Sequence, residues 1–461
     1  MSTDLGFTRR LAEFCAGLDL DDIPADVVGH LKLCIADTLA CGVFGSTLAW
    51  SQDVVSMCQR LGRDGSATVW GTGHALGADL ATLANGAQVH SFEFDDLHRR
   101  AIVHPGGVTI PAVAAWAEQD RSQVISGREF LTAVAAGYEA CTRVGLAVGL
   151  GLMRRGWHNN GVVGTFGAAA ATGRMLRLDP AAMEYAISMA ATQSGGLMAA
   201  QYGSSVKRLH AGRAAQSGLY AALLAAGGYR GIDAVLEAPY GGFASTFSDS
   251  SDLDEIVSGL GEQWRLTGVG FKPYPACGSS HTGIDAALGL LADGTVHIED
   301  IDWIRLAVST AALEHVGWPY RPDTVTTAQM SLRFAVATAF VHGSVTVDSF
   351  ADDRLREPAV LSLIDRIEVH PDARADAGGR DSRHLLTMSV GLTGGQVVSR
   401  EVKYARGSDA FPLSPAEVRA KCVSLFESVL PPGCGEDIWG AVDSLEEAGN
   451  VLDLLALLRP S

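Results

Sequence analysis

The sequence predicts a mainly α-helical protein in which a smaller α+β domain interrupts a large helical one. Residues 1–260 consist largely of Ala-rich segments with helical periodicity. The segment WRLTGVGFKPYPACGSSH, which starts at Trp264, is rich in Gly and Pro, and alternating apolar segments follow it. Helical patterns return from Ser414, so we expect the C-terminal tail to join the helical domain again.

The expected helices begin and end at recognisable signals. Asp21, Asp22 and Pro24 precede the apolar segment VVGHLKLCIADTLACGVFG, an arrangement that favours a helix start. Ser126 is a suitable N-cap for the segment that follows it. The glycines at the end of RAAQSGLYAALLAAGG suit a helix C-cap. A short strand is expected in SATVWG, residues 66–71.

Strands and helices alternate in the middle of the chain. Strands are predicted at residues 302–310, 364–371 and 385–402, the last as a hairpin with Thr393–Gly395 as its turn. The helical segments HTGIDAALGLLADG and SLRFAVATAFVHGSV lie among them. This pattern indicates an α+β domain of roughly 130 residues.

Composition narrows the classes of function. The 461 residues are 47% hydrophobic and carry a net charge of −17, with no run of Lys and Arg longer than two. We therefore expect neither a nucleic-acid nor a membrane partner. Eight cysteines without a CxxC pair, and an N-terminus without a leader-like apolar run, favour the cytoplasm. Motifs for nucleotides, zinc proteases and α/β-hydrolases are absent from the sequence.

The densest group of ionisable residues lies in HSFEFDDLHRRAIVHPGG, between two core-like segments. It comprises Glu93, Asp95, Asp96, His98 and His104. Buried carboxylates and imidazoles are costly unless paired, so their clustering predicts a functional site. One alternative is a polar loop that caps two helices through Asp95 and Asp96. A second is a Mn, Fe or Zn site formed by Asp95, Asp96, His98 and His104, although the spacing matches no metal motif.

Other candidates stand at Gly- and Pro-rich breaks, where backbone can approach a ligand. His158 precedes an expected helix start, where N–H groups can help to hold an anion. The remaining candidates are Lys207, His210, Lys272, Tyr274, Cys277, His281 and Tyr320. Taken singly, each residue type is most often a hydrogen-bonded, solvated or buried bystander. Glu139 and Arg143, spaced i,i+4, favour a structural ion pair.

Several segments together resemble the MmgE/PrpD family, which includes 2-methylcitrate dehydratase, cis-aconitate decarboxylase and iminodisuccinate epimerase. In chain order they are ANGAQVHSFEFDDLH with HPGG, SGREFLTAVAAGYEACTRVG, GWHNNGVVGTFGAAAATGRML, VKRLHAGRAAQSGLYAALLAAGGYRG, LEAPYGGF and FKPYPACGSSHTGIDA. The resemblance implies a helical domain of residues 1–267 and 408–461, an α+β lid of residues 268–407, a homodimer, and neither a metal nor an organic cofactor. The segment Gly268–Gly278 is expected to act as a hinge.

The resemblance also implies a pocket between the domains. The residues expected to be catalytic are His104, His158, Lys207, Lys272, Cys277 and His281. Those expected to bind substrate are Glu93, Asp95, Asp96, His210, Tyr274 and Tyr320. The substrates of the family are di- or tricarboxylates, which cations and protonated imidazoles can neutralise.

The sequence leaves the reaction open among lyase and isomerase chemistry. Leu97 stands where the family often has Thr, the spacing to His104 is one residue longer than in the decarboxylase, and Cys277 stands where we expect a His in the decarboxylase branch. A thiolate is a competent base when cations are near, so proton abstraction leading to dehydration of a substrate such as 2-methylcitrate is the first expectation. Epimerisation like that of iminodisuccinate, decarboxylation of cis-aconitate, and a non-catalytic carboxylate-binding role are the alternatives.

Overall fold

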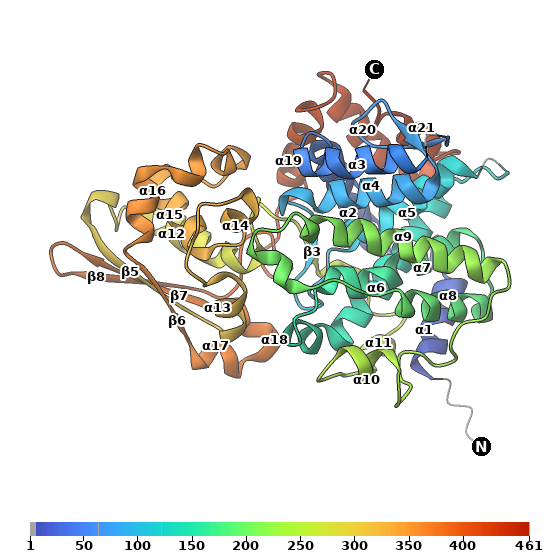
Figure 1. Cartoon of the computed structure of the whole chain (residues 1–461), viewed down its shortest axis with the longest axis horizontal. Coiled ribbons are helices and arrows are strands. Elements are labelled where there is room, and N and C mark those ends of the chain that lie inside the picture. The colour runs from blue at the N-terminus through green and yellow to red at the C-terminus, as the bar shows by residue number, and fades with distance from the viewer. Residues whose placement is uncertain (1–5, 63, 121, 461) are drawn as a thin grey trace. The chain divides into compact units, whose positions relative to one another are not determined.

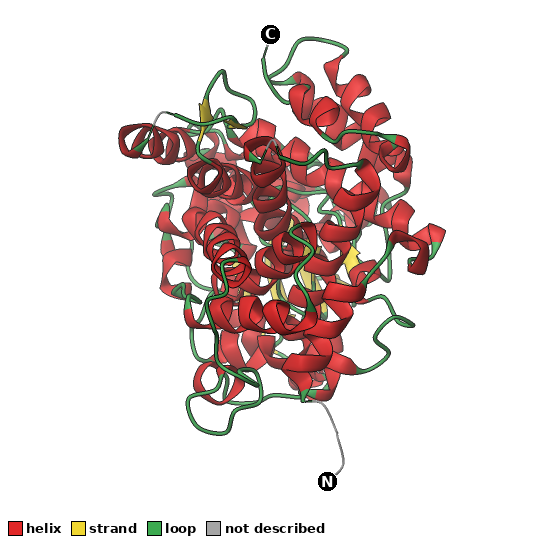
Figure 2. Ribbon diagram, turned by 90° about the vertical axis from the view of Figure 1, so that its right-hand side faces the viewer, coloured by secondary structure: helices red, strands yellow, loops and turns green. Residues whose placement is uncertain are grey.

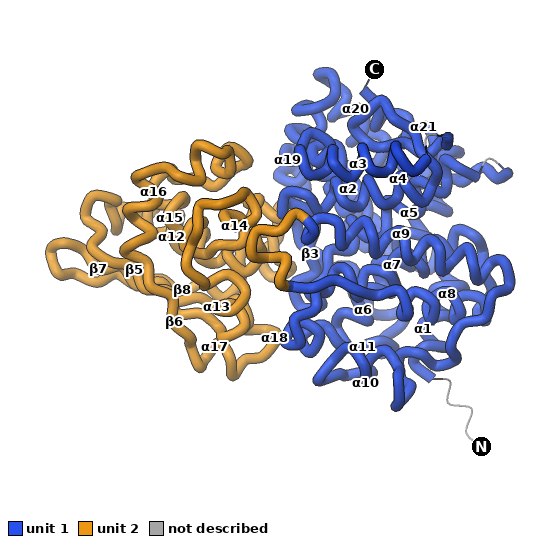
Figure 3. Tube along the Cα trace, viewed as in Figure 1, with its two compact units in different colours: residues 1–198, 206–271, 414–461 blue, residues 199–205, 272–413 orange. Residues whose placement is uncertain are grey.

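The computed structural model describes residues 6–62, 64–120 and 122–460 (Figure 1). Helices dominate it, which confirms the predicted mainly α fold (Figure 2). The chain divides into two compact units, one of residues 1–198, 206–271 and 414–461, the other of residues 199–205 and 272–413 (Figure 3). Each unit is described by itself. Met1–Leu5, part of the N-terminus judged to lack a leader, lie outside the described residues.

The bounds of the units differ from those expected for the domains. The junctions fall at 271/272 and 413/414 instead of 267/268 and 407/408. The segment Ala199–Ser205, expected in the helical domain, belongs to the second unit. Its side chains explain the difference, because the Tyr202 ring packs edge-on against Trp318 at 5.6 Å. A sequence pattern cannot report a contact between residues so far apart.

The first unit is helical. Its helices are α1 (Phe7–Gly17), α2 (Ala25–Gly45), α3 (Ala49–Leu61), α4 (Ala78–Val89), α5 (Pro105–Gln119), α6 (Gly127–Arg154), α7 (Asn159–Met175), α8 (Pro180–Thr192), α9 (Val206–Ala226), α10 (Phe243–Phe247), α11 (Asp254–Val257), α19 (Pro415–Glu427), α20 (Cys434–Asp443) and α21 (Leu452–Ala456). As predicted, Ser126 caps α6, where its hydroxyl accepts from the Glu129 N–H and the Glu129 carboxylate accepts in return. The C-terminal helices belong to this unit.

Two short antiparallel strand pairs accompany these helices. β1 (Ala67–Thr68), within the predicted strand segment, pairs with β2 (Ala75–Leu76). β3 (Leu97–His98) pairs with β4 (Val269–Gly270). The second pair ties the polar stretch around residue 95 to the backbone just before the junction at residue 271. Gly268 is required there, because a Cβ would lie 2.6 Å from Nε2 of His98.

The second unit has a four-stranded sheet of order β6-β5-β7-β8. Its strands are β5 (Ile301–Val308), β6 (Ile367–Pro371), β7 (Leu386–Leu392) and β8 (Val397–Val402). β5 and β6 are parallel, and β7 pairs antiparallel with both β5 and β8. The predicted hairpin is confirmed as β7–β8, since Gly395 takes the positive φ of 81° that its turn requires.

Helices accompany this sheet, and α13 contacts β6. The helices of the unit are α12 (His281–Ala292), α13 (Thr310–Val316), α14 (Val325–Gln329), α15 (Leu332–His342), α16 (Pro358–Ile364), α17 (Ala373–Ala377) and α18 (Gly379–Ser382). α12 contacts β7 and β8 and also packs against α15. On β5 the buried residues Ile304, Leu306 and Val308 alternate with more exposed ones, as expected for a strand with one covered face.

Helix α2 is long and apolar enough to cross a membrane when judged by length and composition alone, with a mean hydropathy of 1.5 over its best window. In the structure, 72% of that window is buried. The helix contacts α4, α5 and α19 within the first unit. It is therefore a core helix of that unit.

Small residues let α4 and α9 pack almost backbone to backbone. A Cβ on Gly212 of α9 would lie 2.1 Å from the Leu83 carbonyl oxygen, and one on Gly86 would lie 2.7 Å from the Gly212 Cα. This contact brings the start of α9, which carries Lys207, close to the end of α4. The site described below depends on it.

We expect Gly212→Ala to destabilise the first unit by about 1–3 kcal/mol, because the added methyl group meets backbone that cannot rotate away. Gly29→Ala is the matched control, since a Cβ there meets nothing within 4 Å on the exposed face of α2. The control variant should be neutral or stabilised by up to about 1 kcal/mol. Thermal unfolding followed by circular dichroism measures both, and equal midpoints for the two variants would contradict the packing argument.

Candidate active site

The polar stretch begins where α4 ends. His90, Ser91 and Phe92 form a single 3-10 turn, and Glu93 then takes a left-handed conformation with φ of 54°. This conformation costs roughly 1 kcal/mol or more for a residue with a Cβ, so surrounding contacts must hold it. The loop runs on through β3 to His104, which precedes Pro105 at the first position of α5. The reversal of the chain places both ends of the stretch side by side.

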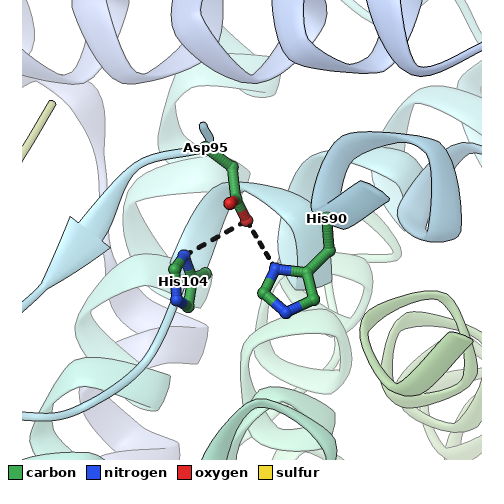
Figure 4. Close-up of side chains that lie close together, drawn as sticks. All are labelled: His90, Asp95 and His104. Carbon is green, nitrogen blue, oxygen red and sulfur yellow. Dashed lines mark hydrogen bonds and ion pairs between the residues drawn. The ribbon is translucent and has the colours of Figure 1, made fainter. Parts of the chain in front are cut away.

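Asp95 is the centre of the site. One of its oxygens, Oδ2, lies 2.8 Å from Nδ1 of His90 and 3.2 Å from Nδ1 of His104 (Figure 4). Asp95 and His90 are fully buried, whereas the side chain of His104 is 13% exposed. The backbone N–H of His104 donates to Oδ1 of Asn160 at 2.9 Å, which fixes the start of α5. Both imidazoles therefore turn their Nδ1 atoms to the same carboxylate.

The protonation states follow from burial and charge. Burial alone would raise the pKa of Asp95, but its contacts with His104 and His90 hold the pKa well below the ordinary value. Burial lowers the pKa of His90 to about 4, although the charge of Asp95 opposes this shift. At neutral pH, Asp95 is thus an anion and His90 a neutral imidazole that donates its Nδ1–H to it. An Nδ1–H of His104 directed at Asp95 leaves Nε2 of His104 as a base.

Two cations from α9 converge on Glu93. Nη1 of Arg208 lies 2.6 Å from Oε1 of Glu93, and Nζ of Lys207 contacts the same oxygen. All three side chains are at most 5% exposed. Charge-assisted bonds of this kind stabilise the left-handed conformation of Glu93. They also keep a buried ammonium group close to the histidines.

A second histidine pair completes the cluster. Nδ1 of His158, at the start of α7, lies 2.8 Å from Nδ1 of His210 on α9. Gly161 and Gly196 make room for it, because a Cβ on either would lie 3.3 Å from His210. Burial and the charge of Lys207 lower the pKa of both imidazoles, that of His210 to about 4. The ring of His158 lies 5.6 Å from that of His90, so the two pairs form one group.

The comparisons with known proteins identify the family. The model of the MmgE/PrpD N-terminal domain matches residues 9–255, and that of the MmgE/PrpD C-terminal domain matches residues 274–447. The chain belongs to the MmgE/PrpD family. It is 34% identical to the cis-aconitate decarboxylase-like protein oryM of Aspergillus oryzae, over 98% of this chain and 97% of that protein. It is 31% identical to a cis-aconitate decarboxylase of Aspergillus terreus and 29% identical to that of Homo sapiens, over 98% of this chain and 96% and 94% of theirs.

In this MmgE/PrpD chain, Asp96 and His98 form hydrogen bonds with other groups of the protein. Asp96 accepts from the Gly106 N–H at the start of α5 and from the Tyr138 hydroxyl. Burial and the charges of Asp37 and Asp95 raise the pKa of Asp96 well above its ordinary value, so its charged form is disfavoured. Nδ1 of His98 accepts from the Ala101 N–H. Among the residues that the structure describes, the atoms that could bind a metal gather within 4.8 Å in His90, Asp95 and His104, and not in the predicted set with Asp96 and His98.

The other predicted site residues belong to the second unit. Lys272, Cys277 and His281 are almost fully buried, and Nε2 of His281 lies 3.1 Å from the Ala276 carbonyl oxygen. The Tyr274 hydroxyl donates to Asp285, and the Tyr320 hydroxyl donates to the Leu355 carbonyl oxygen. The roles predicted for these five residues, and the hinge at Gly268–Gly278, remain predictions. Asp96 binds Gly106 and Tyr138 and lies outside the cluster. The other predicted residues lie together in the first unit; they are Glu93, Asp95, His104, His158, Lys207 and His210.

Sequence reasoning missed two members of the cluster. His90 marked the start of the polar stretch but received no role, and Arg208 was noted beside Lys207 and His210 but also received no role. His90 shares Asp95 with His104, and Arg208 shares Glu93 with Lys207. A helix ending in His five residues before an Asp-Asp pair is a signal that could have pointed to His90. The predicted structural role of Glu139 and Arg143 is confirmed, because this pair is fully buried and Arg143 binds backbone carbonyls of residues 256–263.

The depressed histidine pKa values make the folded state sensitive to acid. His90 and His210 titrate near pH 4 when folded, against about 6.5 in the unfolded chain. The unfolded state therefore binds more protons in this range, and the free energy of unfolding should fall as the pH drops from about 6.5 to 4. Thermal midpoints from pH 7 to 4.5 should fall less steeply for His210→Gln than for the unsubstituted protein. Exposed His74→Gln is the control, and equal slopes for both variants would contradict the assignment.

Proposed function

We propose that this chain is a lyase that acts on a tricarboxylate, with decarboxylation of cis-aconitate as its reaction. The similarity to cis-aconitate decarboxylases over nearly the full length of the chain supports this choice. It favours the reaction that sequence analysis placed behind dehydration and epimerisation. The observation that carries the chemistry is the Asp95–His104 pair, in a cluster where the charge of Lys207 acts on His90 and His158.

In the proposed site, one group of residues neutralises the charge of the substrate and another transfers the proton. Lys207 and Arg208 supply positive charge for substrate carboxylates, because Arg binds carboxylates through paired donors and Lys acts as a point charge. His104, oriented by Asp95, exchanges a proton through Nε2. Fixed cations near a carbon that gains negative charge lower the barrier more than solvent does, since they need no reorganisation.

The decarboxylation balances with a single proton. The bond between a carbon and its carboxylate breaks and releases CO2, and the electron pair shifts to form a new double bond. The electron pair of the original double bond takes up a proton at the far carbon. A trianion and one proton thus give CO2 and an unsaturated dianion. We assign the delivery of this proton to the histidine cluster, with the imidazolium form of His104 as the donor at Nε2. His104 takes this proton up from solvent before the reaction and returns to the neutral form on delivering it.

Cys277 favours a second candidate. A thiol is a weaker acid than an imidazolium near neutral pH, whereas a thiolate beside a cation can abstract a proton. This chemistry suits dehydration of a hydroxy-tricarboxylate such as 2-methylcitrate, and also epimerisation. The two candidates differ in whether CO2 or water leaves.

Proton NMR in D2O separates the reactions when cis-aconitate, 2-methylcitrate and an iminodisuccinate source are offered one at a time. We expect cis-aconitate to lose CO2 and the product to contain one solvent deuterium. Alkene formation from 2-methylcitrate alone would establish the dehydratase instead, and deuterium uptake without loss of CO2 or water would establish the epimerase. A parallel series with a strong chelator tests the donor set His90, Asp95 and His104 for a metal requirement. We expect the rate to survive chelation.

Neighbouring carboxyl groups offer a matched pair of substitutions. Asp95→Asn should lower kcat about 10²–10⁴-fold, because the amide no longer holds His104 in the required tautomer. Asp96→Asn should keep kcat within about threefold, since burial and neighbouring charges disfavour the charged form of Asp96, and an amide oxygen can accept the same two hydrogen bonds. Steady-state kinetics on the accepted substrate measures both. Similar losses in the two variants would remove Asp95 from the reaction.

A further inference from the structure

A buried lysine from the C-terminal part of the chain contacts the backbone of the polar stretch at Phe94. Nζ of Lys421, on α19, donates to the Phe94 carbonyl oxygen at 2.6 Å and lies 4.1 Å from the Phe94 ring centre. It also lies 2.7 Å from Oδ1 of Asp37 on α2. The side chain of Lys421 is 8% exposed, and that of Asp37 is fully buried.

The ammonium group holds a peptide that matters for the site. Phe94 lies between Glu93, which has the left-handed backbone, and Asp95, which holds both histidines. A shift of the Phe94 peptide would move both neighbouring carboxylates. Burial alone would lower the pKa of Lys421, but the negative charge of Asp37 outweighs burial and raises it. The donor is therefore charged at neutral pH.

Stability alone is a poor explanation for this pair. Replacing a buried ion pair by apolar residues of similar size is often neutral or stabilising, because the desolvation of two charges offsets their attraction. Helices α2 and α19 already pack against each other. The pair adds something that apolar packing cannot provide, namely a fixed donor for the Phe94 carbonyl group.

We propose that Lys421 and Asp37 form a positioning pair, which holds the Phe94 peptide so that Asp95 meets His90 and His104 in one geometry. Asp37 orients the Lys421 ammonium group and keeps it charged. Lys421 in turn holds the Phe94 carbonyl group in place. Neither residue touches substrate. The kinetic part of this inference rests on the proposed function, whereas the structural part does not.

The test replaces both charges at once, in Asp37→Leu/Lys421→Met, so that no unpaired charge stays buried. The control is Lys32→Met/Glu446→Leu. It removes a second ion pair between α2 and the C-terminal segment, in which Lys32 also binds a backbone carbonyl group, that of Asp443. In the control pair, Lys32 binds Glu446 and Asp443, whereas Lys421 binds Phe94. The two double variants therefore differ in whether the lost lysine holds the Phe94 peptide.

Two readouts are taken on the full chain. The low-field proton NMR signal of the His90 Nδ1–H, assigned with His90→Gln, reports the bond to Asp95 without any substrate. We expect it to be lost or broadened in Asp37→Leu/Lys421→Met and kept in the control variant. With an accepted substrate, kcat should fall about 10–100-fold in the first variant, as small displacements of catalytic groups do, with a smaller change in KM. The control should stay within about twofold of the unsubstituted protein.

A conservative variant separates positioning from folding. Asp37→Asn/Lys421→Gln keeps a neutral donor for the Phe94 carbonyl group and should recover most of kcat and the His90 signal. An unchanged His90 signal in Asp37→Leu/Lys421→Met would overturn the proposal, and so would unfolding of both double variants. If the unsubstituted protein turns over no tricarboxylate, the proposed function fails while the NMR signal still decides the positioning role.

Discussion

An ionised carboxylate without solvent, that of Asp95, is the constraint on which the site depends. Moving such a charge out of water costs several kcal/mol unless donors surround it. Here the imidazoles of His90 and His104 approach the same oxygen, at 2.8 and 3.2 Å. The geometry of the end of α4, the loop and the start of α5 is therefore dictated by the need to keep these three groups together.

Close helix packing supplies the rest of the site. Gly86 and Gly212 let α4 and α9 approach, so that Lys207 and Arg208 reach Glu93. Gly161 leaves space for His210 beside the start of α7. Larger residues at these positions would separate helices that each carry part of the site. The Ala- and Gly-rich composition of the first 260 residues is thus a condition for gathering charged side chains in a helical interior.

Sequence patterns predicted the features that depend on residues close together in the chain. Helical periodicity, the Ser126 cap and the β7–β8 hairpin arise from residues near one another in the sequence, and the clustering of Asp95 with His104 was visible within ten positions. The contacts of Lys421 with Asp37 and Phe94, and of Tyr202 with Trp318, join distant segments, and no periodicity encodes them. Asp96 has the same residue type as its neighbour Asp95 but the opposite environment, which only the fold reveals. The reaction was ranked from one position, Cys277, whereas similarity over the whole chain favours another order.

Neutral imidazoles beside fixed cations suit an anionic substrate for an electrostatic reason. Burial first, and then the charge of Lys207, lower the pKa of His158 and His210. A bound polycarboxylate would neutralise Lys207 and add negative charge, and both changes raise the pKa of a nearby imidazole. The histidines would then gain protons as the substrate arrives and lose them when it leaves. In such a site, the charge of the substrate itself prepares the acid that its reaction consumes, whichever group departs.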